Sequence, residues 1–100
     1  MKVIFDDEAL VDLRRIVAWI AKDNRPAAQE LVERIFDKAE RLATPGLTNM
    51  GHPGLKSGTR ELTEYPYIIV YEVHADREQI VVLSVVHGSQ DREHREHYRL

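Results

Sequence analysis

Residues 58–62 (GTREL), 65–73 (YPYIIVYEV) and 80–89 (IVVLSVVHGS) are the stretches that decide the fold of this 100-residue chain. They are rich in β-branched and aromatic residues, which favour strands, and only short polar segments separate them. Strands joined by such short connections pair antiparallel. The second half of the chain therefore predicts a small sheet with strands at about residues 59–64, 67–74 and 79–87.

Two of these strands also indicate where the core lies. One face of the strand at 67–74 is wholly apolar, since alternate residues share a face. These residues are Tyr67, Ile69, Tyr71 and Val73. The strand at 79–87 is an almost unbroken apolar run, which is typical of a central strand or of one buried on both faces. Residues 44–58, with their prolines and glycines, are expected to form the main loop.

The first half of the chain begins with a short strand and a helix. Residues 2–5 form a brief β-branched and aromatic run. Asp6 and Asp7 end this run and can cap the helix that follows. Apolar residues then recur every three or four positions, which predicts a helix over about residues 7–22. They are Leu10, Leu13, Ile16, Val17 and Ile20.

A second helix follows a tight turn at residues 23–26. Pro26 disfavours helical geometry at the preceding residue, and Asn24 can cap the next helix. The apolar spacing of three and four then resumes and stops before Pro45. It comprises Ala28, Leu31, Val32, Ile35, Phe36, Ala39 and Leu42. Because the connection is short, the two helices are expected to be antiparallel neighbours.

Together these elements predict an α+β fold in the order β-α-α-β-β-β. A helix hairpin packs on one face of a small, mainly antiparallel sheet. Residues 1–100 form one domain, since a chain of this length has room for one core. Residues 88–100 are polar, so they are expected to form a short tail or a terminal helix.

Composition narrows the class of protein. The chain has no cysteine, which excludes disulfides and thiolate metal sites and favours a reducing compartment, with the cytoplasm as the expected location. No apolar stretch is long enough for a signal peptide or a membrane span. The net charge is −3 and basic residues alternate with acids, so no membrane partner and no direct sequence-specific nucleic-acid binding are expected.

Metal and cofactor sites have little support in the sequence. His94, His97 and Asp91 could share one side of a terminal helix, but solvated histidines explain this polar segment better than a metal site does. Glycine patterns typical of nucleotide-binding loops are missing, and no serine lies in a nucleophile motif. We therefore expect neither a metal nor a cofactor.

Metal-free RNA cleavage would need less machinery. The ribose 2′-OH is an internal nucleophile, so a base, an acid and cations near the phosphate suffice. His87 could serve as acid or base and Arg60 could hold a phosphate, with help from His52, Lys56 or Tyr98. Structural roles compete with this reading: Arg60 could be an exposed strand arginine, and His87 could be a hydrogen-bonded residue at a strand end.

Two tyrosines beside a proline, Tyr65 and Tyr67, could stack on the bases of a single strand. Tyr67 lies on the apolar face of its strand, so we expect the pair to pack in the core instead.

Four segments, in order, resemble the ParE/RelE superfamily of toxins from bacterial type II toxin–antitoxin modules. Residues 12–35 (DLRRIVAWIAKDNRPAAQELVERI) are similar to its helix hairpin, and residues 51–62 (GHPGLKSGTREL) to its segment ending in R-E-L. Residues 67–73 (YIIVYEV) are similar to its Y-x-I-V-Y-x-V strand, and residues 82–91 (VLSVVHGSQD) to its closing V-x-H-G-x-R. The resemblance covers almost the whole chain.

This resemblance implies a toxin neutralised by a co-expressed antitoxin, and it allows two activities. The ParE branch inhibits DNA gyrase by binding it, whereas the RelE branch cleaves mRNA on the ribosome. Where the nuclease branch has cations, this chain has Ile68 in the third strand, Thr59 and Glu61 around the second, and Ser89 and Gln90 after the last. The resemblance therefore favours a gyrase-binding toxin that is not an enzyme.

Two alternatives remain open at this point. One is a ribosome-dependent endoribonuclease with Arg60 and His87 as its catalytic residues. The other is a decayed toxin that only binds its antitoxin. In each case the antitoxin is expected to cover the helix hairpin and to reach a sheet edge.

Overall fold

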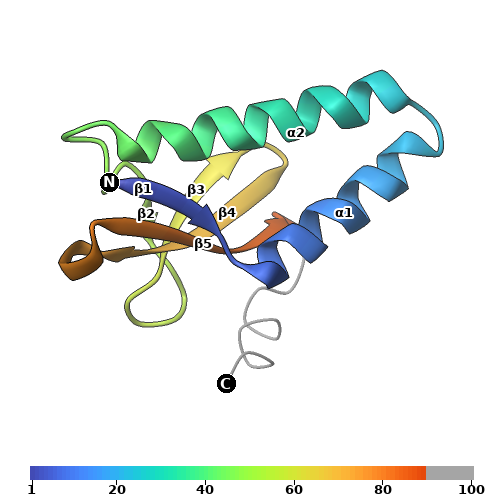
Figure 1. The fold of residues 1–100 in the computed structure, drawn as a ribbon. Helices are drawn as coiled ribbons and strands as arrows, with labels where there is room; N and C mark the ends of the chain where they lie inside the picture. The colour runs from blue at the N-terminus through green and yellow to red at the C-terminus, as the bar shows by residue number, and fades with distance from the viewer. Residues whose placement is uncertain (90–100) are drawn as a thin grey trace.

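The computed structural model describes residues 1–89 and places two helices on one face of a five-stranded sheet (Figure 1). Residues 90–100, and with them most of the predicted tail and the residues His94, His97, Asp91 and Tyr98, lie outside the described residues. The elements are β1 (Lys2–Phe5), α1 (Asp7–Ala21), α2 (Arg25–Glu40), η1 (Arg41–Ala43), β2 (His52–Pro53), β3 (Arg60–Glu64), β4 (Tyr67–His74), η2 (Ala75–Arg77) and β5 (Gln79–His87).

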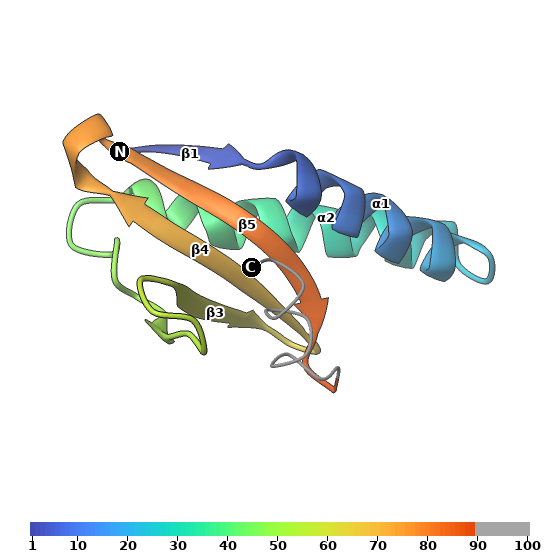
Figure 2. The same ribbon diagram turned by 90° about the horizontal axis from the view of Figure 1, so that it is seen from below.

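The sheet has the order β1-β5-β4-β3-β2, with β1 parallel to β5 and the other neighbours antiparallel. Seen from below, β5 lies between β1 and β4 (Figure 2). The predicted α+β fold, the antiparallel hairpins and the interior position of the last strand are therefore confirmed. The sequence did not predict β2, a two-residue strand inside the expected loop, because so short an edge pairing has no apolar pattern of its own.

The helix starts differ from the predicted capping in one respect. Asn24 caps α2 as expected, since its side-chain oxygen accepts a hydrogen bond from the Ala27 amide at 3.0 Å. Asp6 stands at the N-cap of α1, but its side chain makes no capping hydrogen bond. Its amide instead donates to the Val82 carbonyl at 2.9 Å, so the residue continues the pairing of β1 with β5.

The core lies between the helix hairpin and the sheet, as the apolar spacing predicts. A register break between β4 and β5 pairs Val70 with Ser84 and Tyr71 with Val82, which leaves Leu83 as an extra residue in β5. Both Val82 and Val85 consequently join the core beneath the helices. This bulge explains why the last strand reads as an unbroken apolar run rather than as a strict alternation.

Candidate functional site

Arg60, the cation that the sequence singled out, holds the loop before β3. Its Nη2 donates to the carbonyl oxygen of Asn49 at 3.2 Å and also to that of Gly51. Its register partner is Tyr71, whereas that of Glu61 is Val70, so Arg60 and Glu61 point to opposite faces of the sheet. The guanidinium is therefore engaged in fixing a backbone turn.

Tyr71, a core residue, also holds this turn through its hydroxyl group. Its side chain is fully buried, and its hydroxyl donates to the Thr48 carbonyl at 3.1 Å and accepts from the Gly51 amide at 3.2 Å. A Cβ at Gly51 would lie 2.3 Å from the Glu61 carbonyl oxygen, so only glycine allows this close approach. Arg60 and Tyr71 together attach residues 48–51 to the sheet.

His87, the other residue that the sequence singled out, closes β5. Its ring stands edge-on to Tyr67 with 5.3 Å between the ring centroids. Its Nδ1 accepts from the Ser89 amide at 3.1 Å and lies 2.7 Å from the Ser89 hydroxyl. Because an amide can only donate, the neutral ring carries its proton on Nε2.

The sheet does not bring Arg60 and His87 together. Arg60 is paired with Tyr71 in the middle of β4, whereas His87 is paired with Tyr67, the first residue of the same strand. The two paired positions on β4 are four residue steps apart, which is about 13 Å along the strand. An acid or base and a phosphate-binding cation would have to act across that span.

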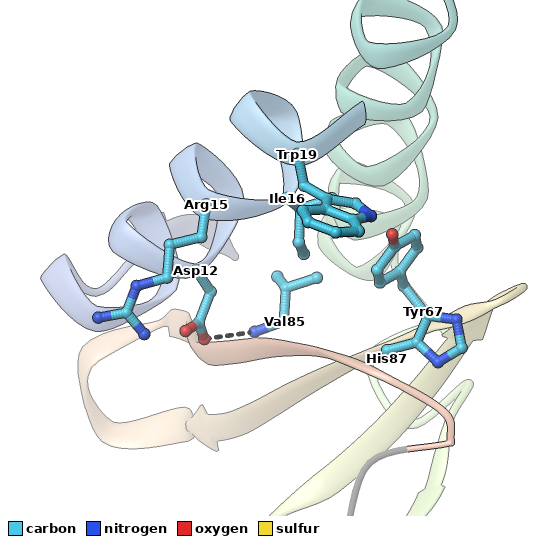
Figure 3. Close-up of a pocket in the computed structure, with 7 residues that line it drawn as sticks. All are labelled: Asp12, Arg15, Ile16, Trp19, Tyr67, Val85 and His87. Carbon is cyan, nitrogen blue, oxygen red and sulfur yellow. Dashed lines mark hydrogen bonds between the residues drawn. The ribbon is translucent and has the colours of Figure 1, made fainter. Parts of the chain in front are cut away.

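His87 instead lines a recess between α1 and the strand ends, which we call the strand-end recess (Figure 3). It has a volume of about 290 Å³. Helix α1 contributes Asp12, Arg15, Ile16 and Trp19, and the strands contribute Tyr67, Val85 and His87. Trp19 from α1 and Tyr67 from β4 face one another across this space, whereas the Arg15 side chain extends away from it.

Asp12 forms the inner wall of the recess, where its carboxylate accepts a β5 amide that lies beyond the end of β1. β1 pairs with β5 only as far as Val82, so the amide of Val85 lies beyond the end of its neighbour. The buried carboxylate of Asp12 accepts from this amide at 3.0 Å. Asp12 could not be singled out from the sequence, because a polar residue in an amphipathic helix normally faces solvent.

We expect Asp12→Ala to lower the free energy of unfolding by about 2 kcal/mol, since it leaves a buried amide without its acceptor. Asp12→Asn retains an acceptor oxygen and should cost less than about 1 kcal/mol. Urea unfolding followed by circular dichroism measures both. Asp37→Ala, at an exposed position of α2, is the matched control. Equal effects at residues 12 and 37 would contradict the assigned role.

A second depression, the hairpin groove, lies between α1 and α2 and has a volume of about 350 Å³. Its walls are apolar except for one arginine. They comprise Leu10, Leu13, Arg14, Val17, Ala18, Val32 and Phe36. Phe36 and the nearby Val11 are both exposed, so the hairpin presents apolar surface to a partner.

The positions where a nuclease would carry cations have other structural roles here. Glu61 is only 1% exposed and Thr59 is also buried. Thr59 donates from its hydroxyl to the Lys56 carbonyl at 2.6 Å, and Ile68 pairs with Thr63 and Val86. These sites therefore contribute to packing rather than to a cationic surface.

Tyr65 and Tyr67 were both expected to pack in the core, and the structure confirms this for one of them. Tyr67 belongs to the core, whereas Tyr65 is 84% exposed at the turn between β3 and β4. The alternation that places Tyr67 inward does not extend through the turn to Tyr65. Within residues 1–89, no three histidine, aspartate or glutamate side chains are grouped as metal ligands. No helix in that part of the chain could cross a membrane.

Comparisons with known proteins agree with this architecture. Residues 3–92 match the family described as the ParE toxin of the type II toxin–antitoxin system parDE. Y4kP, named as a candidate toxin of Sinorhizobium fredii, is 39% identical over 84 residues, which are 82% of each chain.

Two solved structures share the fold. The chromosomal ParDE toxin–antitoxin system of Pseudomonas aeruginosa gives a TM-score of 0.74 at 21% identity, over 87% of this chain and 95% of the other. The RelBE2 toxin–antitoxin complex of Mycobacterium tuberculosis gives 0.53 at 22% identity, over 86% and 88%. The family match spans almost the whole sequence, and the chain therefore belongs to the ParE toxins of type II toxin–antitoxin systems.

Proposed function

We propose that this toxin acts by binding and inhibiting DNA gyrase, and that it is not an enzyme. The observation that carries the proposal is the role of Arg60. This residue is the cation retained from the nuclease pattern, and its guanidinium donates to two loop carbonyls rather than facing an open site. Its Nε is buried as well, and no acceptor among the described residues lies within reach.

The energetics of RNA cleavage support the same conclusion. Removing a single donor that stabilises transition-state charge commonly costs about 2.7–4 kcal/mol. Ile68, Thr59 and Glu61 supply no cation at the positions where the nuclease branch has them. Efficient cleavage would require replacements that the described part of the sheet does not supply.

The partner that restrains the toxin is an antitoxin whose amphipathic helix lies in the hairpin groove. The two solved relatives are both parts of toxin–antitoxin systems, which supports a protein partner of this kind. The groove offers an apolar floor between two helices, and Arg14 at its edge favours an acidic residue on the incoming helix. A bacterial toxin with these partners acts in the cytoplasm.

Supercoiling by purified gyrase tests the activity. We expect this toxin at concentrations on the order of 1 µM to inhibit supercoiling of relaxed plasmid, and the co-purified antitoxin to restore it. Full supercoiling activity in the presence of excess folded toxin would rule out gyrase as the target.

The competing activity, ribosome-dependent cleavage, rests on His87, whose ring has a defined tautomer and lines an open recess. Primer extension on a translated mRNA distinguishes the two activities. We expect no new cuts in the presence of toxin. Cuts that appear with the wild-type toxin and are missing with His87→Ala would establish ribosome-dependent cleavage instead, provided that the variant keeps the wild-type melting temperature.

A further inference from the structure

The strand-end recess and the hairpin groove lie on opposite sides of α1. An α-helix turns about 100° per residue. On that basis two groups of α1 residues are centred about 180° apart around the helix axis. The groove group is Leu10, Arg14 and Val17, and the recess group is Asp12, Arg15 and Trp19. A helix lying in the groove would therefore not cover the recess.

Trp19 is the most exposed aromatic residue of the recess. The residue is 71% exposed and does not belong to the core cluster. Lys22 places its ammonium 5.2 Å from the centre of the ring. An exposed tryptophan with a cation above one face is a typical energetic centre of a protein interface.

The size and walls of the recess define what can occupy it. Sites for drug-sized ligands typically measure about 300–1,000 Å³, so a volume of about 290 Å³ suits one large side chain. Ile16 and Val85 supply apolar contacts, and Tyr67 adds a second aromatic ring. One aromatic side chain from another protein fits this lining.

Charge at the rim favours acidic residues beside that aromatic side chain. Arg15 is exposed at the rim and Lys22 lies next to Trp19. The one carboxylate in the wall, that of Asp12, already accepts the Val85 amide. Two cations suit a short acidic peptide, whereas a nucleic acid would need a larger set of cations.

We propose that the strand-end recess is a second protein-docking site, which binds an aromatic side chain flanked by carboxylates. It is separate from the groove for the antitoxin helix, and it does not depend on gyrase being the target. Arg15 and Lys22 select the acidic flanks, and Trp19 and Tyr67 contact the aromatic ring.

The intrinsic fluorescence of Trp19 can report binding at the recess, because it is the only tryptophan of the chain. The probe is the synthetic peptide acetyl-Glu-Asp-Phe-Glu-Asp-amide, which contains neither tryptophan nor tyrosine. We expect a saturable change in Trp19 fluorescence with the full-length toxin. The same peptide with alanine in place of phenylalanine, and a peptide with lysine in place of each acid, should bind about tenfold more weakly or not at all.

Matched variants locate the binding. Arg15→Glu should weaken binding about tenfold, whereas Arg77→Glu, the same change at an exposed residue in η2, should alter it by less than about twofold. A fluorescein-labelled peptide followed by anisotropy extends the test to Trp19→Ala, for which we also expect about a tenfold loss. Trp19 is exposed, so the variant should keep the wild-type melting temperature.

Three outcomes would overturn the proposal. One is equal binding by the Arg15→Glu and Arg77→Glu variants. In the second, the acidic peptide leaves Trp19 fluorescence unchanged, whereas a single-stranded oligothymidylate changes it saturably. That result would identify a nucleic-acid site instead. The third is loss of peptide binding when a groove variant of normal stability is used, which would place the peptide in the antitoxin groove.

Discussion

An Ala18→Glu variant should bind its antitoxin about 100-fold more weakly than the wild-type toxin does. Ala18 lines the hairpin groove and is exposed, so the new side chain can be accommodated in the free protein. A bound helix would instead bury the carboxylate among apolar groups. An unpaired buried charge costs several kcal/mol, and about 2.7 kcal/mol already corresponds to 100-fold in affinity.

Isothermal titration with the purified antitoxin measures this effect directly. Ala75→Glu is the matched control, because it makes the same substitution at an exposed residue in η2, away from both helices. Its affinity should stay within about twofold of wild type, and both variants should retain the wild-type melting temperature. In cells that co-express antitoxin, only Ala18→Glu should arrest growth. Unchanged affinity would show that the antitoxin helix does not lie in the groove.

The elements of the fold could be predicted because their apolar periods are long and regular. The alternation from Tyr67 to Val73 fixed the inward face of β4, and the spacing of three and four fixed the inward side of both helices. The register break at Leu83 could not be predicted in the same way. A bulge depends on how two strands fit against a third layer, and the one-dimensional pattern of an apolar run is compatible with several registers.

The candidate site was less accessible to sequence reasoning, for a related physical reason. Arg60 and His87 stand out by residue type, but pairing along β4 separates them. Asp12 meets its partner 73 residues away, and the partner is a backbone amide that carries no sequence signal. Trp19 did leave a signal, since it falls outside the apolar repeat of its helix and a large aromatic residue there has no core to enter.

The second large effect is expected at Arg60, where Arg60→Ala should lower the free energy of unfolding by about 2–4 kcal/mol. The change removes a charged donor from the carbonyls of Asn49 and Gly51. For a domain of this size the melting temperature should fall by roughly 10–20 °C. Differential scanning calorimetry measures this shift. Arg77→Ala, which removes the same side chain at an exposed position, should change it by less than about 3 °C.

The stability of the Arg60→Ala variant distinguishes a structural cause from a functional cause for any loss of toxicity. If Arg60 acts by fixing residues 48–51, then Tyr71→Phe, which removes the other attachment of that turn, should be coupled to it. The double variant should then lose less stability than the sum of the two single changes, by about 0.5 kcal/mol or more. A melting temperature unaffected by Arg60→Ala, together with lost toxicity, would instead make the guanidinium part of the toxic surface. That combination would restore the nuclease interpretation, because a cation that the fold does not need would then be required for activity alone.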